Sequence, residues 1–179
     1  MTDKFASPLM RGTLEVARGF VGVREEPPGS NWGKEIERFL ASTGIRTPAP
    51  WCAAFVYFCV KSAATELRVE NPFAKIKLKA YTPAWLEWAD AHGEKLTGGK
   101  AAALSPAEFA REIPPGTIFL LYYPKLKRVG HIGFIAGAPD ESGYIPTIEG
   151  NTDLRGSRTG GGVILRTRRL RGIYRLVRY

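Results

Sequence analysis

The segment from Trp51 to Ala64 constrains the fold most, because its residues are apolar around nearly the whole circumference of a helix. A surface helix has one apolar stripe, whereas a helix that is apolar all round is buried among other elements. We therefore expect a central helix enclosed by the rest of the chain. At roughly 150 residues per domain, the 179 residues are enough for one such unit, and we assign residues 1–179 to a single domain.

Other helices are expected on both sides of this segment. Apolar residues recur at helical spacing over 8–23 and 32–43, which is typical of amphipathic helices. Ser105 and Glu108 form a capping-box pattern around a proline at the first helical position, which marks another short helix. Trp85 and Trp88 belong to a further one.

The pattern changes to strands after residue 116. Turn residues separate five segments rich in β-branched and aromatic residues. These segments are 117–123, 131–136, 144–149, 163–168 and 173–179. Helices followed by successive strands predict an α+β fold, with the helices packed on a mostly antiparallel sheet of about five strands.

The charge is strongly positive, with 26 Lys and Arg against 17 Asp and Glu, a formal net charge of +9 and a pI near 9.8. Such a balance suits a polyanionic partner: a bacterial envelope, a nucleic acid or an anionic lipid surface. The excess is concentrated late in the chain, at Arg155, Arg158, Arg166, Arg168, Arg169, Arg171, Arg175 and Arg178. We therefore expect one basic region near the C-terminus.

The sequence contains no apolar run near the roughly 20 residues that a transmembrane helix needs. Its N-terminus also lacks the uninterrupted apolar stretch and the cleavage site of a secretory signal. We expect a protein without a transmembrane segment, made in the cytoplasm. If it acts outside that compartment, another route must deliver it.

Two cysteines fall in the apolar helix, Cys52 at its start and Cys59 two turns inside. Seven residues of helix separate their Cα atoms by roughly 10 Å, which is too far for a disulfide, so both are expected to be free thiols. The helix N-terminus favours the thiolate form of Cys52. The alternative for Cys52, and our assignment for Cys59, is a small buried apolar residue.

His131 begins a strand, and the next strand carries Glu149 and Asn151 on the same side if its extended geometry persists. A carboxylate or amide that faces His131 could accept its ring N–H and fix the tautomer that takes a proton from a thiol. The alternatives are a merely hydrogen-bonded histidine and a turn at Glu149 and Asn151. The two cysteines and two histidines match no zinc-ligand spacing, so no metal or other cofactor is expected.

Three stretches, residues 51–56, 130–135 and 148–152, resemble in this order the CHAP family of cysteine, histidine-dependent amidohydrolases and peptidases. The similarity extends from about Gly22 to Arg168. It implies a papain-like fold with the nucleophile at the N-terminus of the central helix. It also implies cleavage of amide bonds in bacterial cell-wall peptidoglycan, as in phage endolysins and other bacteriolytic enzymes.

The resemblance also assigns roles to residues. Cys52 would be the nucleophile, His131 the general base and acid, Glu149 the orienting group and Asn151 an accessory polar group. Residues 46–50 contain no glutamine like the oxyanion donor of papain-like peptidases. Asn31 is one candidate for that donor, with an ordinary loop position as its alternative.

For the aromatic residues we expect Trp51 to line a substrate groove. Aromatic side chains dominate core energetics, and we expect Tyr81, Trp85, Tyr122 and Tyr123 to fill the core rather than a groove.

The main hypothesis is a monomeric peptidoglycan amide hydrolase, an N-acetylmuramoyl-L-alanine amidase or a murein endopeptidase, that works in the periplasm or cell wall. It needs no nucleic acid, and an immunity or delivery protein could accompany it. A cysteine acyltransferase or peptidase with another substrate uses the same residues. A non-catalytic basic domain that binds cell wall or nucleic acid is the third possibility, with Cys52 simply buried.

Overall fold

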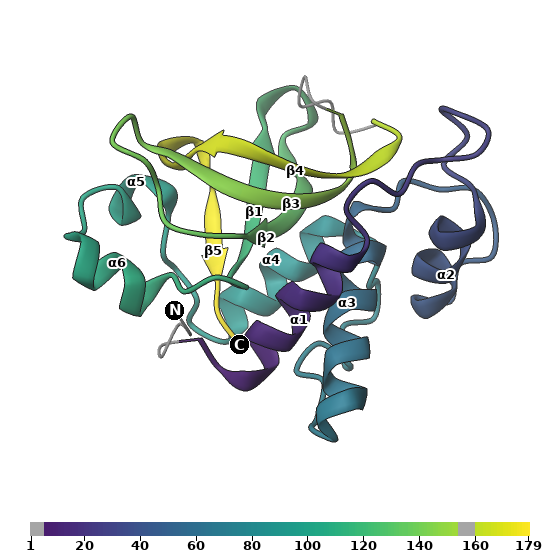
Figure 1. Cartoon of the computed structure of the whole chain (residues 1–179), viewed down its shortest axis with the longest axis horizontal. Helices are drawn as coiled ribbons and strands as arrows, with labels where there is room; N and C mark the ends of the chain where they lie inside the picture. Colours follow the sequence, from purple (N-terminus) through teal and green to yellow (C-terminus); the bar gives the residue numbers. More distant parts are fainter. Residues whose placement is uncertain (1–5, 154–159) are drawn as a thin grey trace.

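The computed structural model describes residues 6–153 and 160–179. Within them the helices come first and the strands second (Figure 1). The helices are α1 (Pro8–Gly19), α2 (Lys34–Ser42), α3 (Cys52–Leu67), α4 (Thr82–Ala91), α5 (Gly98–Ala101) and α6 (Pro106–Glu112). The strands are β1 (Ile118–Tyr123), β2 (Arg128–Ile135), β3 (Tyr144–Thr152), β4 (Gly162–Arg169) and β5 (Arg175–Val177).

The five strands form one sheet in the order β4-β3-β2-β1-β5, and neighbouring strands are antiparallel. Helices α1, α3 and α4 lie beneath the sheet in the view of Figure 1, while α5 and α6 lie at its left and α2 at its right. The prediction of an α+β fold with helices packed on an antiparallel sheet of five strands is confirmed.

Helix α3 is the buried helix that its apolar sequence predicts. Ala53, Phe55, Val56 and Val60 are each 0% exposed, and they belong to a cluster that joins α3 to α1, α2 and the sheet. Because this core surrounds the helix, its first residue is held at a fixed place relative to β2 and β3. That placement determines the geometry of the site described below.

Several boundaries differ from the sequence prediction. Helix α3 continues three residues past Ala64 to Leu67, and Arg68 closes it in the left-handed conformation. Strand β2 starts at Arg128, because an antiparallel partner in β1 extends it toward the turn. The capping box of Ser105 and Glu108 is present at α6. The four-residue helix α5 was not predicted, because its sequence is too short to show helical periodicity.

Within the described residues, no helix combines the length and the apolar character that crossing a bilayer requires.

Candidate active site

Cys52 is the first residue of α3 and is 6% exposed. It lines a cleft of about 330 Å³ together with residues of three other segments. These segments are the loop before α3, the stretch that leads into α4, and the start of β2. The thiol is therefore recessed but open to a small group that enters the cleft. Cys59 is 0% exposed, and burial raises its pKa well above the usual value, so it is the inert thiol expected.

His131 and Glu149 meet in the interior beside the cleft. Nε2 of His131 lies 2.7 Å from Oε2 of Glu149, and both side chains are 0% exposed. The other ring nitrogen, Nδ1, has no hydrogen-bond partner among the described residues. The thiol of Cys52 interacts with the ring and helps to raise its pKa. Nδ1 is thus the ring nitrogen left for the sulfur.

The contact between His131 and Glu149 depends on Gly133. Strands β2 and β3 pair Phe134 with Ile148, and the same antiparallel register continued by one residue places Gly133 opposite Glu149. A Cβ at Gly133 would lie 3.0 Å from Cγ of Glu149. Because Gly133 has no side chain, Glu149 can cross it diagonally and reach His131, the residue two positions along β2. Glu149 therefore occupies the space that a side chain at position 133 would fill.

Arg168 on β4 holds the far side of Glu149. Its Nε donates to Oε1 at 2.8 Å and its Nη2 donates to Oε2 at 2.5 Å, while the hydroxyl of Thr147 donates to Oε1 at 2.7 Å. Such a two-pronged guanidinium contact fixes both the charge and the plane of a carboxylate. Sequence reasoning missed this role, because Arg168 was counted with the basic region. The alternation of β4 could have indicated it. Arg166 and Arg168 lie on the half-buried side of this strand, and the residues that alternate with them are exposed.

These contacts shift two pKa values in opposite directions. Burial alone would lower the pKa of His131, but its interactions with Cys52 and Glu149 outweigh burial and raise the pKa to about 9. Burial alone would raise the pKa of Glu149, but the hydrogen bonds and charges of Arg168 and His131 outweigh it and hold that pKa well below its ordinary range. The site therefore favours a carboxylate paired with an imidazolium at neutral pH.

Asn151 lies apart from His131. The extended geometry does not persist to this residue, which has φ 55° at a register shift between Glu149 and Thr152. The Asn151 amide is fully buried. In the orientation that satisfies both of its ends, it accepts from the N–H of Trp51 at 2.8 Å and donates to the carbonyl of Gly160 at 2.9 Å. It braces the residue before Cys52 and, among the described residues, is not hydrogen-bonded to the imidazole.

The groove role predicted for Trp51 is wrong. Trp51 is 0% exposed, its Nε1 donates to Oε1 of Glu25 at 2.8 Å, and its ring packs between Phe39 and Phe55. Asn31 lies in the loop before α2, where its φ of 53° is left-handed. Asn31 is not among the lining residues of the cleft.

The other aromatic residues divide between core and surface. Trp85 is 1% exposed and confirms its core assignment. That assignment is wrong for Tyr81 and Tyr122, which are 44% and 42% exposed. Tyr81 lines the cleft of Cys52, so an aromatic wall exists there, on a residue that the sequence placed in the core.

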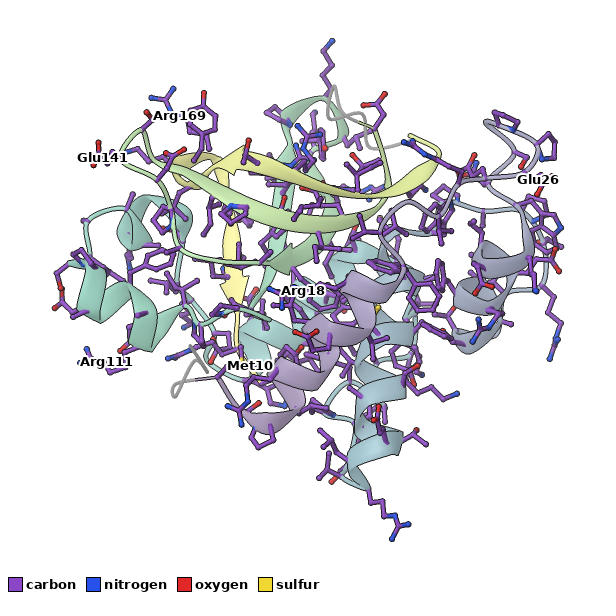
Figure 2. The ribbon with its side chains drawn as sticks, viewed as in Figure 1. Met10, Arg18, Glu26, Arg111, Glu141 and Arg169 are labelled. Atoms are coloured by element: carbon purple, nitrogen blue, oxygen red, sulfur yellow. The ribbon has the colours of Figure 1, made fainter. Side chains whose placement is uncertain are left out.

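The late arginines do not form one free basic surface. Arg166 and Arg168 turn toward Glu149, Arg175 pairs with Asp90, and Arg178 pairs with Glu94 and Glu112. Arg169 projects outward from the end of β4, as Figure 2 shows. Arg155 and Arg158 lie outside the described residues. Four of these arginines are thus used in ion pairs within the chain, two of them with the buried Glu149.

Among the described residues, no group of three or more His, Cys, Asp or Glu side chains is arranged to hold a metal ion. Comparisons with protein-family models, with curated proteins and with solved structures gave no match.

Proposed function

We propose that the protein is a cysteine-dependent amide hydrolase with Cys52 as nucleophile, His131 as base and acid, and Glu149 as the orienting group. The observation that carries the proposal is the buried imidazole of His131. It is hydrogen-bonded to Glu149 at 2.7 Å through Nε2 and open at Nδ1, beside a thiol that lines a cleft. A nucleophile, a base and a group that orients the base are the parts that acyl transfer requires.

The reaction proceeds through an acyl-enzyme. The Cys52 thiolate attacks the carbonyl carbon of the amide, and the resulting tetrahedral intermediate collapses when His131 gives its Nδ1 proton to the leaving amine. His131 then takes a proton from a water molecule, which attacks the thioester and releases the carboxylic acid. Glu149 accepts the Nε2–H throughout and stabilises the imidazolium.

The first turn of α3 supplies groups that can stabilise the oxyanion. Among the described residues no side chain caps this helix, whose N-cap position is Trp51. The N–H of Trp51 is occupied by Asn151, whereas the N–H groups of the first turn remain for a ligand. The backbone N–H of Cys52 is one oxyanion donor in this proposal. Asn151 acts indirectly, by holding the segment that precedes Cys52.

The resemblance to the CHAP family implies a papain-like fold and activity on peptidoglycan, and it supports the choice of substrate class. We propose cell-wall peptidoglycan as the substrate and extend the papain-like description to this α+β fold. The net charge of +9 supports adhesion to an anionic wall, which salt weakens. The internal ion pairs of the late arginines weigh against the alternative of a purely basic binding domain.

Digestion of purified sacculi followed by mass spectrometry of the released fragments tests the function, the bond and the nucleophile together. Wild type is expected to release new amine and carboxyl ends. Cys52→Ala should lower the rate by at least about 10³-fold, because removing the nucleophile of such a set leaves only binding and oxyanion effects.

Cys59→Ala is the matched control, since it removes the other thiol of the same helix without touching the cleft. It should keep the wild-type rate. Full activity in the Cys52→Ala protein would refute the proposal. Alkylation of Cys52 without any release from sacculi would instead favour another acyl substrate for the same residues.

A further inference from the structure

The cleft beside Cys52 carries positive charge without a compensating carboxylate. Lys77, Lys79 and Arg128 line it, and no Asp or Glu is among its lining residues. None of the three forms an ion pair with another described residue. This differs from Arg166 and Arg168, which face the buried Glu149.

Neutral groups hold two of these cations in place. Nζ of Lys79 donates to the carbonyl of Ile76 at 2.7 Å and lies 5.5 Å from the centre of the Tyr57 ring. Nη1 of Arg128 donates to the carbonyl of Val129 at 2.9 Å, and its guanidinium carbon lies 5.2 Å from the centre of the Tyr81 ring. Carbonyl and ring contacts orient a cation but leave its full charge uncancelled. The two head groups are therefore partly ordered before any ligand binds.

Three like charges around one recess raise its potential, and an anion that enters it relieves their repulsion. The recess also contains apolar walls from Ile45, Ala49 and Leu78. An apolar wall lowers the local dielectric and strengthens the attraction between a cation and an anionic group. The chemistry of the cleft thus fits a group that is apolar in part and carries one negative charge.

We propose that the cleft selects substrates with a free carboxylate close to the scissile carbonyl, held by Lys79 and Arg128 while Cys52 attacks. Arg128 can bind both oxygens of a carboxylate, and Lys79 contributes a second charge. The exposed Lys77 extends the positive field to the entrance. This inference rests on the proposed function, because it places the carboxylate relative to an attacking thiol.

Two alkylating reagents of nearly the same size test the field at Cys52 directly: iodoacetate, which carries a carboxylate, and neutral iodoacetamide. The rate of each reagent at Cys52 is followed by mass spectrometry of the peptide that contains this residue. The measured quantity is the iodoacetate rate divided by the iodoacetamide rate in folded protein, relative to the same ratio in urea-unfolded protein. Folding should raise this ratio at least about 10-fold, since a cleft lined with one sign of charge concentrates the opposite ion. Lys79→Gln and Arg128→Gln should each lower it by about 3- to 10-fold.

Lys61→Gln is the matched control, because it removes one positive charge from α3, the helix of Cys52, about 13 Å along the helix axis from that residue. It should leave the ratio unchanged. Equal ratios in folded and unfolded protein, with rapid iodoacetamide alkylation, would overturn the carboxylate selection and leave Cys52 as a nucleophile. An unchanged ratio in both cleft variants would also overturn it.

Sacculi whose carboxylates have been converted to amides provide the substrate test. Native sacculi should be digested at least about 10-fold faster than amidated sacculi, and Arg128→Gln should reduce that preference while Lys61→Gln keeps it. Equal digestion of both would overturn carboxylate selection while the hydrolase proposal stands. Failure to digest either, together with a folding-independent alkylation ratio, would overturn both proposals.

Discussion

Glu149 is a carboxylate with no exposure to solvent, and it depends on Arg168 for its charge. An unpaired carboxylate in the interior is costly enough that it takes up a proton instead. The two N–H groups of Arg168 prevent this and leave the Oε2 atom directed at Nε2 of His131. Arg168 is therefore a positioning residue for the histidine.

Arg168→Gln should raise the pKa of Glu149 and move the acidic limb of the pH–kcat profile to higher pH. It should also lower the free energy of unfolding by about 3 kcal/mol, because it leaves a buried charge without its partner. This value is the lower end of the range for such pairs, since Arg168 itself is partly solvated. Arg169→Gln, an exposed neighbour, should change stability by less than about 0.5 kcal/mol. A lower kcat with an unmoved pH profile would contradict the positioning role.

The ionisation of His131 makes stability depend on pH. Its folded pKa of about 9 lies above the ordinary histidine value of 6.5, so protonated His131 stabilises the folded state. This contribution is complete below pH 6.5 and is lost as the pH rises through about 9, and its size is on the order of 3 kcal/mol.

Urea unfolding of wild type and His131→Gln across this range measures the effect. The difference in free energy of unfolding between the two proteins should shrink from pH 6 to pH 9.5. A constant difference would show that folding leaves the pKa of His131 at its ordinary value.

The close approach of strands β2 and β3 at Gly133 lets Glu149 reach His131. A Cβ at Gly133 would meet the carbonyl of Ile148 and the ring of Phe119, both at 2.9 Å, besides Glu149. The pairing of the two strands therefore depends on one residue without a side chain. The same residue keeps the path of Glu149 open.

Gly133→Ala should displace Glu149 and destabilise the protein by about 1–3 kcal/mol, the range for overpacking a core. Activity should fall more than stability requires, and this is checked by kcat at a temperature where the variant is fully folded. Gly19→Ala, at an exposed position with nothing within 4 Å of the added methyl group, is the control. A Gly133→Ala protein with normal kcat would contradict the crossing of Glu149 over this residue.

Sequence patterns predicted the elements better than their contacts. Period and turn signals placed the helices other than α5 and the five strands, and motif order brought Cys52, His131 and Glu149 into one region. The position of Asn151 could not be predicted, because a register shift turns it away from the face of Glu149. Trp51 was expected in a groove but lies in the core, and Tyr81 was expected in the core but lines the cleft. The exposure of both depends on tertiary neighbours that local sequence does not encode.

At the scale of the whole molecule, Phe39 on α2 joins the N-terminal helices. Its ring contacts Phe20, Phe55, Phe58 and Trp51, with centroid distances of 5.1–5.7 Å. Trp51 is the residue before the candidate nucleophile. The packing of α2 is thus linked to the position of the thiol.

Phe39→Ala should lower the free energy of unfolding by about 3–5 kcal/mol, because a large cavity forms in a dense aromatic cluster. Leu165→Ala, at a side chain that is 55% exposed, should cost less than about 0.5 kcal/mol. Urea unfolding of both variants checks the difference. A cost near 1 kcal/mol for Phe39→Ala would mean that α2 is only loosely attached.

Strand β2, which carries His131, lies in the middle of the five-stranded order. A central strand exchanges its amide hydrogens only when most of the molecule opens, whereas edges and loops exchange by local fluctuation. On heating, the imidazole should therefore keep its place until the cooperative transition. Catalysis and native tertiary structure would then disappear at the same temperature.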